Sequence, residues 1–245
     1  METYIVEGNI SVKAVLQGKK RKVLKVIVDP KKKDKDTAYI LRYAKKEQIE
    51  IEYLSRNTID QLAQGNTHGG ILAVCSERQY QQLHTILHKD YVFLALIEGV
   101  EDPFNFGYIL RTLYAAGCDG VIVSPRNWTT AVNVVTKSSA GASEYLSIFI
   151  AHDMEQTLQQ LKQHQIQLVL GQRSDAINLY DYTFPKKVCI GIGGELRGLS
   201  KLVQKYSDQN LYIPYESEFK NAMTAATSTA IFAFEYVRQK QKGNM

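Results

Sequence analysis

The stretch that decides the fold lies in the middle of the chain. It reads Asp102-Pro103-Phe104-Asn105-Phe106-Gly107-Tyr108-Ile109-Leu110-Arg111-Thr112. An apolar run at 91–97 precedes it, and a second apolar run follows at 120–123. This order predicts a buried strand, a polar turn, a helix and another strand. Strands that alternate with helices are typical of a parallel sheet covered on both faces, so we expect an α/β fold.

The turn in this stretch is a candidate site. In open α/β sheets, ligands bind beyond the carboxyl ends of the strands, and residues 102–107 fall at such an end. Asn105 can donate and accept hydrogen bonds, Gly107 allows close backbone approach, and the planar fork of Arg111 can bind a phosphate. The alternative is an ordinary strand–turn–helix with a capping asparagine and a surface arginine. Both interpretations fit the stretch taken alone.

A glycine-rich segment at 191–198 follows the apolar strand 188–190. A dinucleotide-binding Gly-x-Gly-x-x-Gly pattern starting at Gly191 requires glycine at position 196, which is Leu196. No Gly-Lys-Ser/Thr follows, so the segment is not a P-loop either. The spacing therefore argues against a nucleotide-binding oxidoreductase. It predicts a bend at which backbone groups contact a ligand, with Glu195 placed to pair with a cation or an N–H group.

A third segment begins at Leu211-Tyr212-Ile213-Pro214 and leads into a helix expected at 221–239. Small residues dominate the first turns of this helix, which favours close packing against another backbone, a subunit interface, or a plain buried helix.

The remaining pattern divides the chain into two α/β domains, at 1–78 and 91–245, joined by a polar connection at 79–90. We expect Asp36 to cap the second helix. The expected strands are 23–28, 49–53, 70–75, 91–97, 120–123, 146–150, 167–171, 188–192 and 211–213. The expected helices are 10–16, 37–47, 55–62, 105–116, 130–138, 154–164, 198–205 and 221–239.

The positive charge of the chain is concentrated near its start. Residues 1–50 contain 13 Lys/Arg against 7 Asp/Glu, whereas the whole chain has a net charge of +5. The densest clusters are Lys19-Lys20-Arg21-Lys22 and Lys31-Lys32-Lys33. A concentrated basic region is what a polyanion such as RNA requires, although a solvated face gives the same pattern.

Bulk properties favour a cytoplasmic protein. The sequence has no run near the roughly 20 apolar residues of a membrane helix, and its start lacks a signal-peptide pattern. Cys75, Cys118 and Cys189 show no metal-ligand spacing, and we expect them to be small core residues. The five histidines also form no spaced cluster, so no metal site is expected.

The three segments together resemble the signature motifs of the SpoU/TrmH family of knotted RNA ribose 2′-O-methyltransferases. The matching positions are Asn105, Gly107, Arg111 and Thr112 in the first motif, Gly193, Glu195 and Gly198 in the second, Ile213-Pro214 and Phe234-Glu235 at the ends of the third, and Lys137 to Ala142 in the family's Lys-x-Ser-x-Gly-Ala segment. Residues 1–75 resemble the family's ribosomal-protein-like RNA-binding domain. The resemblance thus covers nearly the whole chain.

The resemblance implies a C-terminal domain with a deep trefoil knot, S-adenosylmethionine as methyl donor, and a homodimer in which both subunits shape the active site. It implies RNA as the substrate, and the appended N-terminal domain favours ribosomal RNA over transfer RNA. The cofactor contacts that it implies are Gly171, Gly193, Ile213, Ala222 and Met223. The residues expected to contact RNA are Lys19, Lys20, Arg21, Lys22, Lys25, Arg111 and Lys137.

The family assigns the proton-accepting role to the arginine of its first motif, here Arg111. Because arginine side chains keep their proton in proteins, we favour Arg111 as electrostatic support for the developing alkoxide and the adjacent phosphate. Asn105 would position the ribose. Glu195 would orient either Arg111 or its own loop.

The third motif departs from the family pattern. The family usually carries Ser-Leu-Asn where this chain has Ala222, Met223 and Thr224, with Asn221 close by, and Tyr215 stands where a methionine is usual. This departure leaves open the alternative of a knotted RNA-binding protein without catalytic activity. Binding of S-adenosylmethionine separates the two possibilities.

Overall fold

The computed structural model describes residues 3–125 and 131–243. The chain divides into two compact units, each with its own sheet. Unit 1 comprises residues 1–79 and 127–145, and unit 2 comprises residues 80–126 and 146–245. The first position of the helix expected at 130–138 lies outside the described residues.

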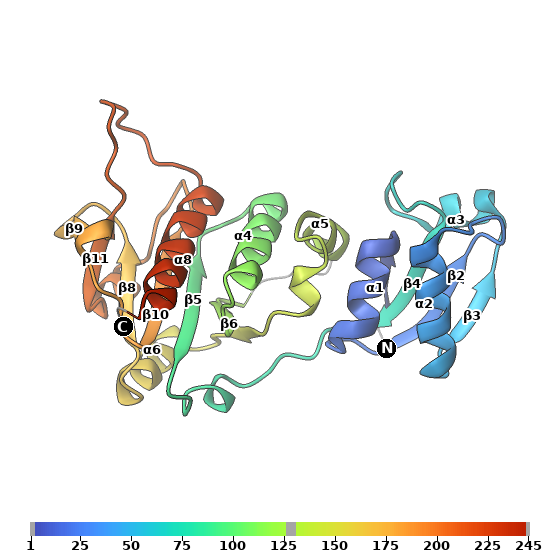
Figure 1. The fold of residues 1–245 in the computed structure, drawn as a ribbon, viewed down its shortest axis with the longest axis horizontal. Coiled ribbons are helices and arrows are strands. Elements are labelled where there is room, and N and C mark those ends of the chain that lie inside the picture. The colour runs from blue at the N-terminus through green and yellow to red at the C-terminus, as the bar shows by residue number, and fades with distance from the viewer. Residues whose placement is uncertain (1–2, 126–130, 244–245) are drawn as a thin grey trace. The chain divides into compact units, whose positions relative to one another are not determined.

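Unit 1 contains a four-stranded sheet in the order β1-β4-β2-β3 (Figure 1). β4 runs antiparallel to both neighbours, and β2 and β3 are parallel. The strands are β1 (Thr3–Glu7), β2 (Val23–Val28), β3 (Glu50–Tyr53) and β4 (Ile71–Ser76), and the helices are α1 (Asn9–Gly18), α2 (Lys35–Lys46) and α3 (Arg56–Leu62). Alternate strand residues such as Val26 and Val28 form one core with α1 and α2, while Ile27 and Leu72 form a second core with α3.

Two local features of unit 1 differ from the sequence expectations. β1 was not expected, although its alternating burial is typical of a strand. The cap of α2 is Asp34 rather than Asp36, because the Asp34 carboxylate accepts a 2.8 Å hydrogen bond from the Thr37 N–H.

A segment from the second half of the chain also belongs to unit 1. It contains α5 (Val132–Ser138) and the 3₁₀ turn η3 (Ala142–Glu144), and α5 packs against β1 and α1. The Glu144 side chain is only 1% exposed and pairs with Arg21 at 3.3 Å and Arg78 at 3.5 Å. The expected boundary at 79–90 placed this segment with the C-terminal domain, whereas its contacts in the structure group it with the N-terminal sheet.

Unit 2 is built on a seven-stranded sheet in the order β7-β6-β5-β10-β8-β11-β9, and all of its strand pairs are parallel. This confirms the expected α/β class. The strands are β5 (Val92–Glu98), β6 (Gly120–Val123), β7 (Ile148–Ile150), β8 (Gln167–Gly171), β9 (Ala176–Asn178), β10 (Lys187–Gly193) and β11 (Gln209–Tyr212). The helices are α4 (Pro103–Ala115), α6 (Met154–Gln163), α7 (Lys201–Lys205) and α8 (Ala225–Gln241).

Helices cover both faces of this sheet, as the alternation of β5 requires. Leu94 and Leu96 lie in one core with Leu158 of α6. Phe93 points to the opposite face, where its ring lies 4.3 Å from that of Tyr236 on α8. α4 packs against α8 on this face (Figure 1).

The polar connection contains the 3₁₀ turn η1 (Leu83–Thr85). Two elements of unit 2 differ from expectation. The short strand β9 was missed. α8 begins at Ala225 rather than at residue 221, so Ala222 and Met223 lie in the loop before the helix.

The three cysteines are buried in the cores, as expected. Burial raises the pKa of the Cys75 and Cys118 thiols to about 12 and raises that of Cys189 as well. Because the thiolate is the reactive form, iodoacetamide at pH 8 should leave the folded protein unlabelled and should label all three thiols in urea. Mass spectrometry measures this, and rapid labelling of the folded protein would contradict it.

No helix among residues 3–125 and 131–243 is long and apolar enough to cross a membrane. The same residues contain no group of three or more His, Cys, Asp or Glu side chains that could hold a metal ion.

Candidate active site

The first two sequence motifs meet at the carboxyl ends of β5 and β10, which are neighbouring parallel strands. The Gly194 N–H donates a 2.8 Å hydrogen bond to the Glu98 carbonyl, and the Ser200 N–H donates a 2.6 Å bond to the Glu98 carboxylate. Both ends of the glycine-rich loop are therefore tied to the last residue of β5. The turn that carries the first motif begins immediately after that residue.

Asp102 and Pro103 fix the start of α4. The Asp102 carboxylate accepts hydrogen bonds from the N–H groups of Phe104 (3.3 Å) and Asn105 (3.0 Å), and Pro103 occupies the first turn, where its missing N–H has no consequence. The capping residue is thus Asp102, and the Asn105 side chain is not used as a cap. That side chain is half-buried and makes no hydrogen bond within the described part of the chain.

Asn105 and Arg111 both lie on α4 but on different sides of it. Six residues of α-helix separate two side chains by about 9 Å along the axis and about 120° around it. Arg111 is exposed, and among the described residues it makes no hydrogen bond or ion pair. Its guanidinium is therefore available to a ligand.

Glu195 binds the start of α8. Its carboxylate accepts a 2.8 Å hydrogen bond from the Ala225 N–H, where the partial positive charge of the helix N-terminus favours an anion. Of the two expected roles, orienting Arg111 or orienting the loop, the structure shows a contact that serves only the second. This contact joins the second motif to the third.

Unit 2 contains a cavity of about 400 Å³ beside these motifs. All five expected cofactor contacts line it: Gly171, Gly193, Ile213, Ala222 and Met223. Neither Asn105 nor Arg111 lines the cavity. The sequence did not single out several other lining residues: Arg173, Gln204, Lys220, Ser228 and Phe232. Arg173 follows β8 within two residues of Gly171, and this position at a strand end was the available signal.

The glycines of the second motif allow two backbone segments to touch. A Cβ on Gly193 would lie 2.5 Å from the Gly198 carbonyl carbon, and a Cβ on Gly194 would overlap the Gly99 carbonyl group. The glycines are therefore required by the fold of the loop as well as by any ligand in the cavity.

The altered third motif forms a well-defined helix start. Thr224 caps α8, because its hydroxyl accepts a 3.2 Å hydrogen bond from the Thr227 N–H. The Tyr215 hydroxyl accepts a 3.1 Å bond from the Met223 N–H and so joins the two ends of the loop. The structure thus shows what Thr224 and Tyr215 do in place of the usual residues.

The basic clusters of unit 1 lie at opposite ends of β2. Lys19 to Lys22 precede this six-residue strand and Lys31 to Lys33 follow it, so about 20 Å separates them. Lys19 is 68% exposed, and burial lowers the pKa of Lys20. These two clusters cannot form one compact phosphate site.

Four of the expected RNA contacts already have protein partners, and the longest of these contacts is the surface pair of Lys19 with Glu47 at 3.9 Å. Arg21 was expected at the surface, but its side chain is only 8% exposed because it pairs with Glu144. Lys25 pairs with Glu52 at 2.9 Å and Glu50 at 3.1 Å, and the hydrogen bond to Glu52 raises its pKa. Lys137 pairs with Glu7. The structure removes Arg21 from the surface and leaves Lys19, Lys20 and Lys22 as the accessible members of the set in unit 1.

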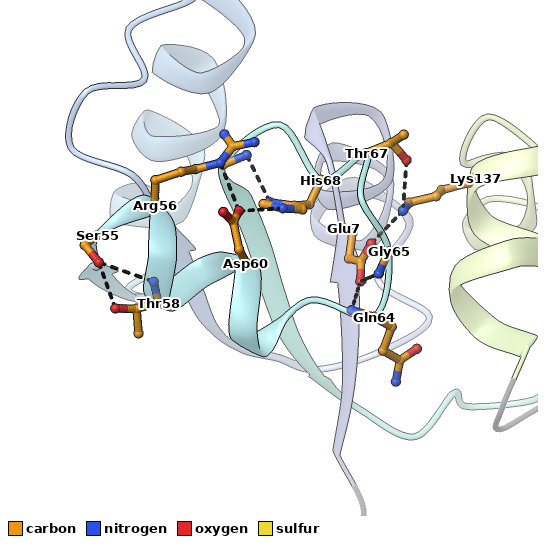
Figure 2. Close-up of polar contacts among 11 residues, drawn as sticks. Glu7, Ser55, Arg56, Thr58, Asp60, Gln64, Gly65, Thr67, His68 and Lys137 are labelled. Carbon is orange, nitrogen blue, oxygen red and sulfur yellow. Dashed lines mark hydrogen bonds and ion pairs between the residues drawn. The ribbon is translucent and has the colours of Figure 1, made fainter.

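Figure 2 shows the Glu7–Lys137 pair within unit 1. The Glu7 side chain is fully buried, and its carboxylate lies 2.6 Å from the Lys137 ammonium. The same carboxylate accepts hydrogen bonds from the N–H groups of Gln64 (2.6 Å) and Gly65 (3.2 Å). The pair therefore ties α5 to β1 and to the loop that follows α3.

Lys137→Met should destabilise unit 1, because it leaves the buried Glu7 carboxylate without its cation. A lost buried partner costs about 3–5 kcal/mol. Since Lys137 is 29% exposed and water can reach the site, we expect a loss of about 2 kcal/mol in the free energy of unfolding. Urea denaturation followed by circular dichroism measures it. The exposed Lys45→Met on α2 is the matched control, and equal stability of the two variants would contradict this role.

Two family descriptions match the chain, one in each half. The SpoU rRNA Methylase family matches residues 92–234, and the description "RNA 2'-O ribose methyltransferase substrate binding" matches residues 5–81. Together they span both expected domains.

Similar proteins match over nearly their whole length. The 23S rRNA (guanosine-2'-O-)-methyltransferase RlmB of Haemophilus ducreyi is 28% identical over 238 residues, which are 95% of this chain and 96% of that protein. A Staphylococcus epidermidis protein assigned to the TrmH family tRNA/rRNA methyltransferases is 26% identical over 248 residues, 99% and 98% of the two chains. The SpoU methyltransferase AviRb from Streptomyces viridochromogenes, solved with AdoMet, has a TM-score of 0.82 at 20% identity, and the match covers 98% of this chain and 91% of that one. This structural likeness shows a shared fold.

Proposed function

Because the chain belongs to the SpoU rRNA methylase family, we propose that it transfers a methyl group from S-adenosylmethionine to a ribose 2′-hydroxyl of ribosomal RNA. The observation that carries the proposal is the meeting of the second and third motifs in the wall of one cavity, which all five residues expected to bind the cofactor line. The match of residues 5–81 to a substrate-binding family supports RNA as the second substrate.

The cavity fits S-adenosylmethionine in size and chemistry. Its volume of about 400 Å³ lies in the range of about 300–1,000 Å³ typical of small-molecule sites. Ile192, Leu199 and Phe232 supply apolar walls for an adenine ring, while Gln172 and Gln204 supply polar groups. Gly171, Gly193, Ile213, Ala222 and Met223 would hold the cofactor. When bound, it supplies a methyl group that its sulfonium makes electrophilic, and this transfer needs no metal.

The residues outside the cavity act on the ribose. In the transfer, the 2′-oxygen would form a bond to the methyl carbon as the carbon–sulfur bond breaks and its electron pair stays on sulfur as the neutral thioether, and the hydroxyl proton would pass to solvent water. Arg111 stabilises the negative charge that develops on this oxygen and binds the adjacent phosphate. Asn105 positions the ribose from another side of α4. Glu195 holds the glycine-rich loop against α8, as its bond to Ala225 supports.

The proposal includes a cytoplasmic homodimer and a knotted C-terminal domain. Phe104 and Tyr108 are 53% and 47% exposed, and they lie along one side of α4 with Arg111. Phe234 on the neighbouring α8 is 48% exposed. An exposed group of large apolar side chains marks an interaction surface, and a second copy of this chain is its proposed occupant. The family membership supports the knot.

Methyl transfer from labelled S-adenosylmethionine to total RNA tests the proposal. The RNA should come from cells that lack this gene, and 2′-O-methyl-sensitive sequencing should locate the product. We expect one new ribose methylation in ribosomal RNA. A methylation in transfer RNA instead would keep the reaction and change the substrate. Failure of both transfer and cofactor binding would favour the alternative of an inactive RNA-binding protein.

A further inference from the structure

The loop between β11 and α8 forms part of the cavity wall without regular secondary structure. It spans residues 213–224 and contributes Ile213, Tyr215, Lys220, Ala222 and Met223 to the lining (Figure 1). A cofactor in the cavity would contact residues from both limbs of this loop. Contacts that already fix the two limbs in the free protein therefore reduce the ordering that binding would otherwise require.

Arg173 connects this loop to the end of β8. Its guanidinium donates a 3.0 Å hydrogen bond to the Lys220 carbonyl and lies 4.7 Å from the centre of the Tyr215 ring. The Tyr215 ring also stacks on Phe219 at 6.2 Å. Within the described part of the chain, Arg173 makes the only hydrogen bond between residues 214–223 and the rest of unit 2. Arg173 thus contacts both limbs of the loop.

Tyr215 connects Arg173 to Met223, one of the residues that line the cavity. Its hydroxyl accepts the Met223 N–H, so the ring that Arg173 covers is bonded to the far end of the loop. The loop is also the part of the chain that departs from the family pattern. Tyr215, one of the residues that depart from the pattern, is therefore a member of this restraint.

We propose that Arg173 and Tyr215 are positioning residues that fix the two limbs of the 213–224 loop in the wall of the cofactor cavity. The inference rests on the proposed function for the identity of the cofactor. Arg173 acts by fixing Tyr215 and Lys220, and its charge is not required to touch the cofactor. Removing either member of the pair frees the same loop, so the factors by which the two single variants weaken cofactor affinity should not multiply in the double variant.

The first test compares Arg173→Gln, Tyr215→Leu and the double variant by calorimetric titration with S-adenosylmethionine. Each single variant should raise Kd about fivefold to tenfold, because the apparent affinity falls with the fraction of molecules in which the loop is in its binding-competent position. The double variant should lie within about twofold of the weaker single variant. Unchanged Kd in Arg173→Gln, or multiplying losses in the double variant, would overturn the proposal.

Two further variants separate the contribution of the Tyr215 ring from that of its hydroxyl, and the loss of Arg173 from the loss of any exposed arginine. Tyr215→Phe keeps the ring under Arg173 but loses the bond to Met223, so its Kd should rise less than that of Tyr215→Leu. Arg42→Gln removes an exposed arginine on α2 and should leave Kd unchanged. An equal loss in Tyr215→Phe and Tyr215→Leu would contradict a role for the stacked ring.

Trypsin provides a readout that does not depend on the cofactor. Cleavage after Lys220 should be faster in Arg173→Gln than in the parent. Apart from the tryptic site at 173, which the substitution removes, cleavage at other positions should keep its rate. If the parent protein binds no S-adenosylmethionine, the proposed function fails, and this proteolysis still tests the pair. Equal cleavage after Lys220 in both proteins would contradict the role of the Arg173–Tyr215 pair without affecting the proposed function.

Discussion

Replacing Arg111 by alanine is expected to reduce methyl transfer by about 100-fold to 1,000-fold while leaving the affinity for S-adenosylmethionine within about twofold. The reduction follows because the guanidinium is the group proposed to stabilise the developing alkoxide. The affinity should hold because Arg111 lies on α4 outside the cavity and is exposed. Folding should also be preserved, since no described residue depends on Arg111 for a hydrogen bond. Single-turnover transfer and calorimetric titration measure the two quantities.

Arg111→Lys sharpens this prediction. A lysine restores the charge but not the planar fork, so it should recover only part of the lost rate. Arg42→Ala on α2 is the control for losing an exposed arginine, and it should keep full activity. Loss of cofactor binding in Arg111→Ala would show that Arg111 acts through the cavity and would reject its assignment to the ribose.

Much of the fold of unit 2 follows from local patterns in the sequence. Continuous apolar runs such as that of β5 and turns at strand ends are short-range features, and they predicted six of its seven strands. Parallel strands bring their carboxyl ends to one edge, so Gly171, Gly193 and Ile213 had to lie near one another once the sheet was assigned. Their choice as cofactor contacts came from the family resemblance, and the cavity that they share agrees with it.

The features that were missed depend on long-range pairs. Arg21 reads as a member of a basic cluster, yet it is buried by Glu144, which lies 123 residues away. The Glu7–Lys137 pair and the placement of α5 in unit 1 have the same origin. The local pattern of apolar and polar residues does not predict ion-pair partners that lie so far apart in the sequence. Glu195 illustrates a related limit, because a carboxylate suits a cation and a helix N-terminus equally well.

Gly194→Ala is expected to weaken cofactor binding and to lower kcat/KM by roughly 100-fold. A Cβ on Gly194 would overlap the Gly99 carbonyl and lie 2.9 Å from the Val100 nitrogen. Neither segment can easily withdraw, because the Gly194 N–H is bonded to the Glu98 carbonyl and both glycines directly follow paired strands. The loop that lines the cavity must therefore shift, and a shift of about 1 Å at a reacting centre can cost about 100-fold.

The stability of the same variant separates a local shift from general unfolding. Overpacking costs about 1–3 kcal/mol, which corresponds to a melting temperature lower by roughly 5 °C in a chain of this size. Gly117→Ala is the matched control, because no atom lies within 4 Å of its Cβ position and only its φ of +73° opposes alanine. This control should lose about 1 kcal/mol and keep its cofactor affinity. If Gly194→Ala bound S-adenosylmethionine as tightly as Gly117→Ala, the close approach of the two loops would not shape the cofactor site.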